Sequence, residues 1–316
     1  RKRSKLWYEG ARKIVDDWSA KYNLPPAQIA AVLAALSPQK DWYQNVSLAE
    51  RVLDIHTQFT RGNTKAWMPP AEMLQRGEQL YLMNDKGKPK TDKMSVQRRG
   101  YIKGILSKPY MDIKHDDPAV QRDMQAIWVR TYDQTYNNRG YRTVTPEGLF
   151  VGEPAGVAAW GSNSELGKAL GVLSGGDLNA ISDMMGLQHK VRSFFNNIID
   201  PNSLDGDVTI DTHAVAAALL RALSQSSKEV AQAFGSSLDK DKQLSDWISP
   251  PGSTVTGAKG LYGIYADAYR EAAAARGVLP REMQSITWEA IRGLFPKKWK
   301  QPENVKAIDN IWREYE

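Results

Sequence analysis

The spacing of apolar residues is the feature of this sequence that most constrains its fold. They recur at intervals of three and four residues, which is typical of amphipathic helices, whereas the alternation typical of half-buried strands is nearly absent. We therefore predict a mainly α protein. The predicted helices cover residues 6–22, 26–36, 42–57, 120–136, 178–185, 191–199, 214–223, 262–275 and 282–294.

The composition is that of an ordinary globular protein. A chain of 316 residues with 41% hydrophobic and 25% charged residues can bury a substantial core, and no apolar run is long enough to cross a bilayer. The basic N-terminus, residues 1–5, leads into a predicted amphipathic helix and not into an apolar segment. We therefore expect no secretory signal, no membrane partner, a cytoplasmic location and a monomer.

Charge and cysteine content restrict the classes of partner and cofactor. Lys and Arg number 42 against 36 Asp and Glu, and the resulting net charge of +6 favours a polyanionic partner without requiring one. The chain has no Cys, which excludes disulfides, thiolate zinc sites and cysteine-ligated iron–sulfur clusters.

Three segments, far apart in sequence, place polar residues at the edges of predicted helices. The first, Ser37-Pro38-Gln39, ends an apolar helix. The second, Met185-Gly186-Leu187-Gln188-His189-Lys190, joins two short helices through a glycine. The third, Val208-Thr209-Ile210-Asp211-Thr212-His213, is an apolar lead-in followed by an acid at the start of a helix.

In this order, the three segments resemble the helix-hairpin-helix DNA glycosylase superfamily, which includes endonuclease III and the adenine-mismatch glycosylases. The resemblance implies a two-lobed helical fold, Asp211 as the catalytic carboxylate and Lys190 at the position of the catalytic lysine of bifunctional members. It also implies that Gln39 is the residue that wedges into the duplex. Gln188 stands where the family usually has the second glycine of its hairpin.

The chemistry of such an enzyme explains why these residue types are needed. Cleaving an N-glycosidic bond builds positive charge on the sugar, and a fixed carboxylate such as Asp211 stabilises that charge. An amine such as Lys190 can instead attack the sugar C1′ and form a Schiff base, provided that its surroundings keep part of it neutral. The target base must first leave the stack and enter a pocket with stacking faces.

The resemblance also divides the chain, as one unit, into two lobes. Residues 28–200 form a helical lobe that contains an insertion, 58–177, and the hairpin, 178–199. Residues 1–27 together with 201–316 form the second lobe, which carries Asp211. Gln39 and Lys190 lie 151 positions apart, a longer interval than in the compact members of the superfamily.

The insertion contains a basic segment, residues 84–108, that could neutralise DNA phosphates or could equally be a solvated charged surface. It also contains Lys114-His115-Asp116-Asp117, which we interpret as the cap of the next helix and not as a metal site. No metal and no cofactor is predicted. The residues expected to contact DNA are Gln39, Gly186, Gln188, His189, Arg192, His213, Lys90, Lys93, Arg98 and Arg99.

Other functions fit the same residues. The part of the chain after Asp211 resembles uncharacterised phage-encoded proteins, which implies a hypermodified phage base as the substrate. Phage enzymes on a glycosylase-like scaffold also transfer an amino acid or polyamine to an activated hydroxymethyl-pyrimidine in DNA, so a transferase is a second hypothesis. The third is a non-catalytic DNA-binding module in which Asp211 only caps a helix and Lys190 is a solvated lysine.

Overall fold

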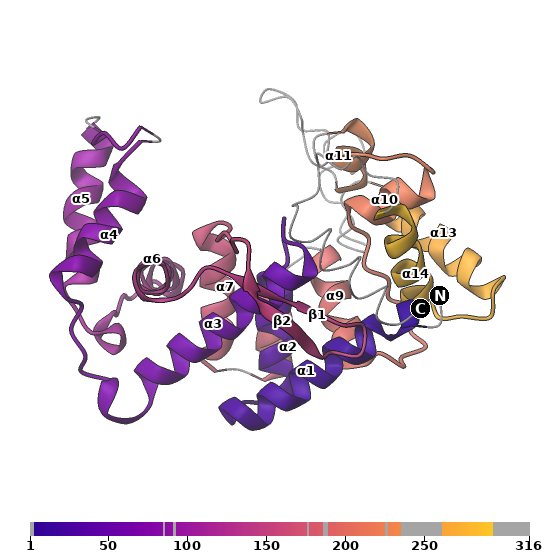
Figure 1. Cartoon of the computed structure of the whole chain (residues 1–316), viewed down its shortest axis with the longest axis horizontal. Helices are drawn as coiled ribbons and strands as arrows, with labels where there is room; N and C mark the ends of the chain where they lie inside the picture. Colours follow the sequence, from indigo (N-terminus) through magenta and orange to yellow (C-terminus); the bar gives the residue numbers. More distant parts are fainter. Residues whose placement is uncertain are drawn as a thin grey trace.

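The computed structural model describes residues 3–84, 86–90, 93–175, 177–185, 189–224, 227–234 and 261–292. Within these residues the protein is mainly helical, as predicted, with one two-stranded sheet (Figure 1). None of the described helices combines the length and the apolar character needed to span a membrane.

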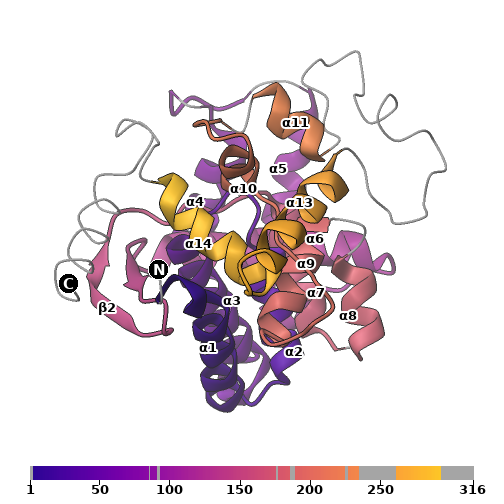
Figure 2. The ribbon, with the colours of Figure 1, turned by 90° about the vertical axis from the view of Figure 1, so that its right-hand side faces the viewer.

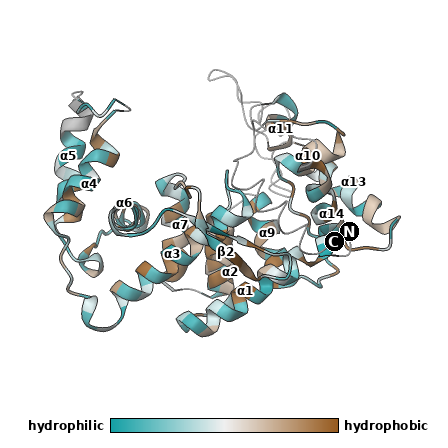
Figure 3. Cartoon of the chain, viewed as in Figure 1, coloured by the Kyte–Doolittle hydropathy of each residue, from teal (hydrophilic) through white to brown (hydrophobic). Residues whose placement is uncertain are grey.

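The larger of two hydrophobic clusters is built around α2 (Pro26–Ala35). Pro26 sits in the first turn, where a missing N–H costs nothing, and Ile29 and Leu33 are fully buried. The helix is apolar on every side because it packs against α1 (Trp7–Tyr22), α7 (Asn163–Leu173), α8 (Leu178–Met185) and α9 (His189–Ile199). Its mostly hydrophobic colour is visible in Figure 3.

A long helix, α3 (Trp42–Thr60), leads from this core toward a second group of helices. It is followed by the short η2 (Gly62–Thr64), by α4 (Ala71–Leu82) and α5 (Lys93–Leu106), by η3 (Tyr110–Asp112) and by α6 (Pro118–Tyr136). Helices α4 and α5 form an arm that stands out from the body in Figure 1. The side chain of Asp117 accepts a hydrogen bond from the Ala119 N–H, which confirms that this acid caps α6.

The sheet consists of β1 (Tyr141–Val144) and β2 (Phe150–Ala155), paired antiparallel with Val144 opposite Phe150. The turn between them packs against α1 so closely that a Cβ on Gly10 would lie 2.1 Å from the Pro146 carbonyl oxygen. Only glycine fits there. Sequence periodicity missed this sheet, since β2 is largely exposed and shows no apolar alternation.

The smaller cluster contains α10 (Thr212–Ala218), α11 (Lys228–Phe234), α13 (Tyr262–Ala274) and α14 (Pro280–Arg292). Figure 2 looks onto this cluster, with η1 (Arg3–Leu6) and α1 beside α14. Glu289 accepts hydrogen bonds from Ser4 and from the Trp7 indole, the latter at 2.5 Å. The N-terminal helices therefore join the two clusters.

Residues 8–22 pack within the larger cluster, where the apolar face of α1 is covered by α2 and α9. Helix α10 ends earlier than predicted, because Leu220 adopts a left-handed backbone conformation with φ of 53° that stops the helix.

Candidate active site

Asp211 is held at the start of α10 by a buried segment, residues 208–210. The Tyr262 hydroxyl donates to the Val208 carbonyl at 2.8 Å and accepts from the Ile210 N–H at 3.0 Å. Asp211 Oδ1 then accepts from the Ala214 N–H at 2.8 Å, so the residue is the N-cap that the sequence predicts. The capping bond uses Oδ1 and leaves Oδ2 for other partners.

The second oxygen of Asp211 faces His213. Oδ2 lies 3.8 Å from His213 Nδ1, and the Asp211 side chain is 22% exposed. Burial alone would raise the pKa of this carboxyl, but the hydrogen bond and charge of His213, the charge of Lys190 and the Ala214 N–H together hold it below its ordinary value. Asp211 is therefore ionised at neutral pH.

Lys190 lies in the first turn of α9 and approaches Asp211 from the larger cluster. Its Nζ donates to the Ser37 carbonyl at 3.3 Å, just beyond the end of α2. Burial lowers the pKa of the Lys190 amine, and the negative charges of Asp211 and Glu165 oppose that shift. The amine and the carboxylate that the sequence pairs are thus close enough to influence each other's ionisation.

The turn after α2 contributes two further polar side chains near Lys190, those of Ser37 and Gln39. Ser37 Oγ is buried and has no hydrogen-bond partner among the described residues. Gln39 is exposed and adopts φ of 57°, a left-handed conformation that is unfavourable for a residue with a side chain. It lies two residues after Ser37, whose carbonyl accepts the hydrogen bond from Lys190.

Half-buried aromatic side chains lie on the elements that carry Lys190 and beside His213. Phe194 lies four residues after Lys190 on the same face of α9, and its ring contacts Trp42 with centroids 6.0 Å apart. The Trp288 ring lies 6.1 Å from that of His213 and 5.7 Å from that of Trp7. Sequence reasoning assigned none of these aromatics, because they come from four separate segments and no local pattern marks them.

A second carboxylate, Glu165, was also missed. It belongs to a capping box at the start of α7, in which Glu165 and Ser162 each bond the backbone N–H of the other. Burial raises the pKa of its carboxyl, while the charges of Lys40 and Lys190 and the bonds from Ser162 lower it. The Ser-x-x-Glu signal is visible in the sequence but indicates only a helix start.

The remaining predicted residues fall into two groups. Gly186 and Gln188 lie outside the described residues, and of His189 only the backbone, at the start of α9, is described. Arg192 is half-buried on the same helix. Lys90, Lys93, Arg98 and Arg99 belong to the α4–α5 arm, which stands apart from α9 and α10 in Figure 1.

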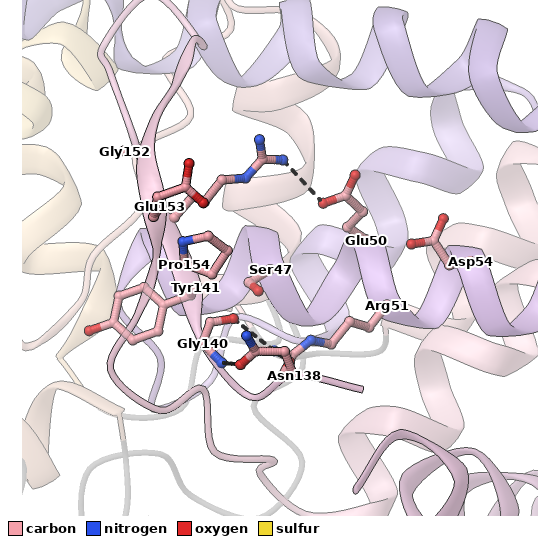
Figure 4. Close-up of a pocket in the computed structure, with 11 residues that line it drawn as sticks. Ser47, Glu50, Arg51, Asp54, Asn138, Gly140, Tyr141, Gly152, Glu153 and Pro154 are labelled. Carbon is pink, nitrogen blue, oxygen red and sulfur yellow. Dashed lines mark hydrogen bonds and ion pairs between the residues drawn. The ribbon is translucent and has the colours of Figure 1, made fainter. Parts of the chain in front are cut away.

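A polar pocket of about 460 Å³ lies elsewhere, between α3 and the sheet (Figure 4). Within it, Arg51 donates to the carbonyls of Asn138 and Gly140, the latter at 2.8 Å, and Glu50 lies 3.9 Å from Arg142. This pairing fastens the sheet to α3. We therefore place the candidate active site at Asp211 and not at this pocket.

Comparison with known proteins gives one match. The model of a family of unknown function (DUF7178) matches residues 1–135 and 249–295, more than half of the chain. No curated protein and no solved structure matches the chain. The matched residues include Gln39, Trp42 and Trp288, whereas Lys190 and Asp211 lie between the two matched segments.

Proposed function

The chain belongs to DUF7178, a family of unknown function, so its chemistry has to be inferred from its own residues, and we propose that it is a DNA N-glycosylase that removes a modified or damaged base. The observation that carries this proposal is that an ionised carboxylate, Asp211, and a half-buried amine, Lys190, lie close enough for the charge of each to shift the pKa of the other, while the amine is anchored on the Ser37 carbonyl. We further propose that the two clusters are the lobes of a helix-hairpin-helix glycosylase fold.

In this proposal Asp211 acts on the sugar. As the bond between C1′ and the base breaks, the base leaves with the bonding electron pair and takes up a proton, and the sugar becomes cationic. The carboxylate stabilises that cation, and water then adds to C1′ and loses a proton. The fixed N-cap geometry of Asp211 supports this role, because a preorganised charge needs no reorganisation during the reaction.

The surrounding side chains fit a base that has left the duplex. Phe194, one turn after Lys190, packs against Trp42, and Trp288 packs against His213; these three half-buried rings could stack on such a base. Gln39 is exposed on a turn whose backbone bonds the Lys190 amine, so it can fill the gap in the stack while the base is in the pocket. DNA is the polyanionic partner that this proposal requires.

The decisive variant is Asp211→Asn. Asn caps helices about as well as Asp, so the free energy of unfolding should change by no more than about 1 kcal/mol. Removing the charge should slow the release of free base, measured by chromatography on a panel of duplexes with modified bases, by about 10²–10³-fold. Asp117→Asn, at the cap of α6, is the matched control and should keep full activity.

Three results would contradict this proposal. One is full activity in Asp211→Asn, which would leave Asp211 as a cap alone. Another is the absence of base release from every duplex in the panel. The third is a heavier nucleoside without an abasic site in mass spectrometry, which would identify a transferase.

A further inference from the structure

The tip of the α4–α5 arm is a defined turn that displays three lysines. The Asn84 side chain accepts hydrogen bonds from the N–H groups of Lys86 and Lys88, each at 3.0 Å. The Lys90 N–H donates to the Leu82 carbonyl at 2.8 Å, which closes the turn. These bonds hold residues 86–90 against Leu82 and Asn84, and the side chains of Lys86, Lys88 and Lys90 are exposed.

More positive charge continues along α5. Arg98, Arg99 and Lys103 are exposed, and neither they nor the tip lysines form an ion pair with any other described residue. Like charges gathered on one element repel each other, so this concentration has an energetic cost in the free protein. A polyanion bound along the arm would remove that cost.

The arm is packed firmly enough to hold these charges in place. Gly77 of α4 meets Leu106 of α5 so closely that a Cβ at Gly77 would lie 2.3 Å from the Leu106 side chain. Met73 and Ile102 are buried in the same contact, and both helices pack against α6. The arm is therefore a structured extension of the core and not a loosely attached segment.

The arm and the catalytic helix point to the same side of the molecule. Figure 1 shows α5 and the α10–α11 pair rising at opposite ends of the molecule, with α1 and α2 on the lower side. Figure 2, turned about the vertical, again places α5 and α10–α11 on the upper side. A long ligand lying across this side would meet both the tip of the arm and the α10–α11 pair.

We propose that the α4–α5 arm binds the phosphates of the same DNA duplex, away from the nucleotide that enters the site at Asp211. This inference rests on the proposed function, because it takes DNA as the partner. A straight duplex carries a regular array of phosphates, which a rigid row of exposed cations can match. The protein would consequently favour a long duplex over a short one.

The test combines an arm variant with duplex length. Lys86→Gln/Lys88→Gln/Lys90→Gln is compared with Lys13→Gln/Lys21→Gln/Lys65→Gln, which removes the same charge from exposed positions on α1 and after η2. Binding is measured by fluorescence anisotropy against duplexes of about 10 and about 30 base pairs, one and three helical turns, in the Asp211→Asn background so that no base is released.

On the long duplex, the arm variant should bind at least tenfold more weakly at low salt than the parent. The slope of log K against log salt should fall by about 2.7, from the loss of three phosphate contacts. The short duplex should bind the arm variant and its parent equally, and the control variant should keep most of its affinity for both lengths.

Unchanged affinity and an unchanged salt slope on the long duplex would overturn the proposal. An equal loss of affinity on both duplex lengths would also overturn it, because the lysines would then contribute only a general attraction to DNA. These binding results are independent of catalysis. If no base is released but the length-dependent loss is found, the arm still binds DNA and only the glycosylase proposal fails. If base is released and the length-dependent loss is not found, the glycosylase proposal stands and the proposal about the arm fails.

Discussion

Lys190 is the single residue with the most specific chemical expectation. If its amine attacks C1′ of an abasic site, borohydride reduction should trap a covalent protein–DNA complex, and Lys190→Gln should form none. Because burial lowers the pKa of Lys190, the trapping rate should rise with pH around a midpoint below the ordinary lysine value of 10.5. The charge of Asp211 raises this pKa, so Asp211→Asn should move the midpoint lower still.

An abasic duplex makes this measurement independent of base release, so the Asp211 variant remains informative. Lys40→Gln is the control, since Lys40 is a second partly buried lysine whose pKa burial also lowers and whose charge acts on Glu165. A midpoint near 10.5, or an upward shift in Asp211→Asn, would contradict the pairing of the two groups. If no covalent complex is trapped, Lys190 is not a nucleophile, and its remaining candidate role is to bind a DNA phosphate.

The residues of the candidate site divide by whether a local signal marks them. Asp211 precedes a helix, and Gln39 follows one, so the positions of both could be predicted from the sequence alone. Trp288 and Trp7 could not, since they are neighbours in space but lie at opposite ends of the chain. Only the packing of α14 on η1 and α1 brings them together.

At the scale of elements, α3 carries a buried group that should make stability depend on pH. His56 is packed against Tyr110, with Nδ1 3.4 Å from the hydroxyl, and burial lowers its pKa from 6.5 to about 4. The unfolded chain therefore binds more protons between these values. The stability that the neutral ring confers is complete above pH 6.5 and is lost as the pH falls toward 4, by up to about 3 kcal/mol.

Urea unfolding at pH 7 and at pH 4.5 measures this loss. His56→Gln can still form a hydrogen bond with the Tyr110 hydroxyl but cannot be protonated. Its free energy of unfolding should therefore decrease less between pH 7 and pH 4.5 than that of the natural chain. His115→Gln is the control, because His115 is exposed. An equal decrease in all three proteins would show that protonation of His56 is not the cause.

The elements themselves were predictable where a helix has a continuous apolar face. Helix α9, with Val191, Phe195 and Ile198 buried at helical spacing, is an example. Helix α4 buries only Met73, Gly77 and Leu82, too few to produce a periodic signal, and was missed.

At the scale of the whole molecule, the candidate site depends on how the two clusters are joined. Asp211 follows Ile210 of the smaller cluster and Lys190 precedes Val191 of the larger one. Among the contacts that link the two clusters is an ion pair between Arg281 of α14 and Glu9 of α1, with atoms 3.2 Å apart. The Arg281 side chain is 3% exposed, whereas that of Glu9 is 34% exposed. The contact between α14 and α1 therefore contains one buried charge, that of Arg281.

Arg281→Met should destabilise the protein by about 1–3 kcal/mol, less than the roughly 3–5 kcal/mol lost when a fully buried pair is broken, because Glu9 can be partly rehydrated. It should also slow base release at temperatures where the protein is fully folded, since the carboxylate and the amine lose their fixed relative position. Arg270→Met, which removes an exposed ion pair with Asp267, should cost less than about 1 kcal/mol and leave activity unchanged.

The double variant Arg281→Met/Glu9→Met separates the two effects. Removing both charges should restore much of the lost stability, because no charge remains without its partner at the contact between α14 and α1. If the ion pair fixes the relative position of the clusters, base release should stay slow in this stable double variant. If activity returns together with stability, the apolar packing of α14 on α1 is enough to hold Asp211 against Lys190, and the ion pair has no part in positioning them.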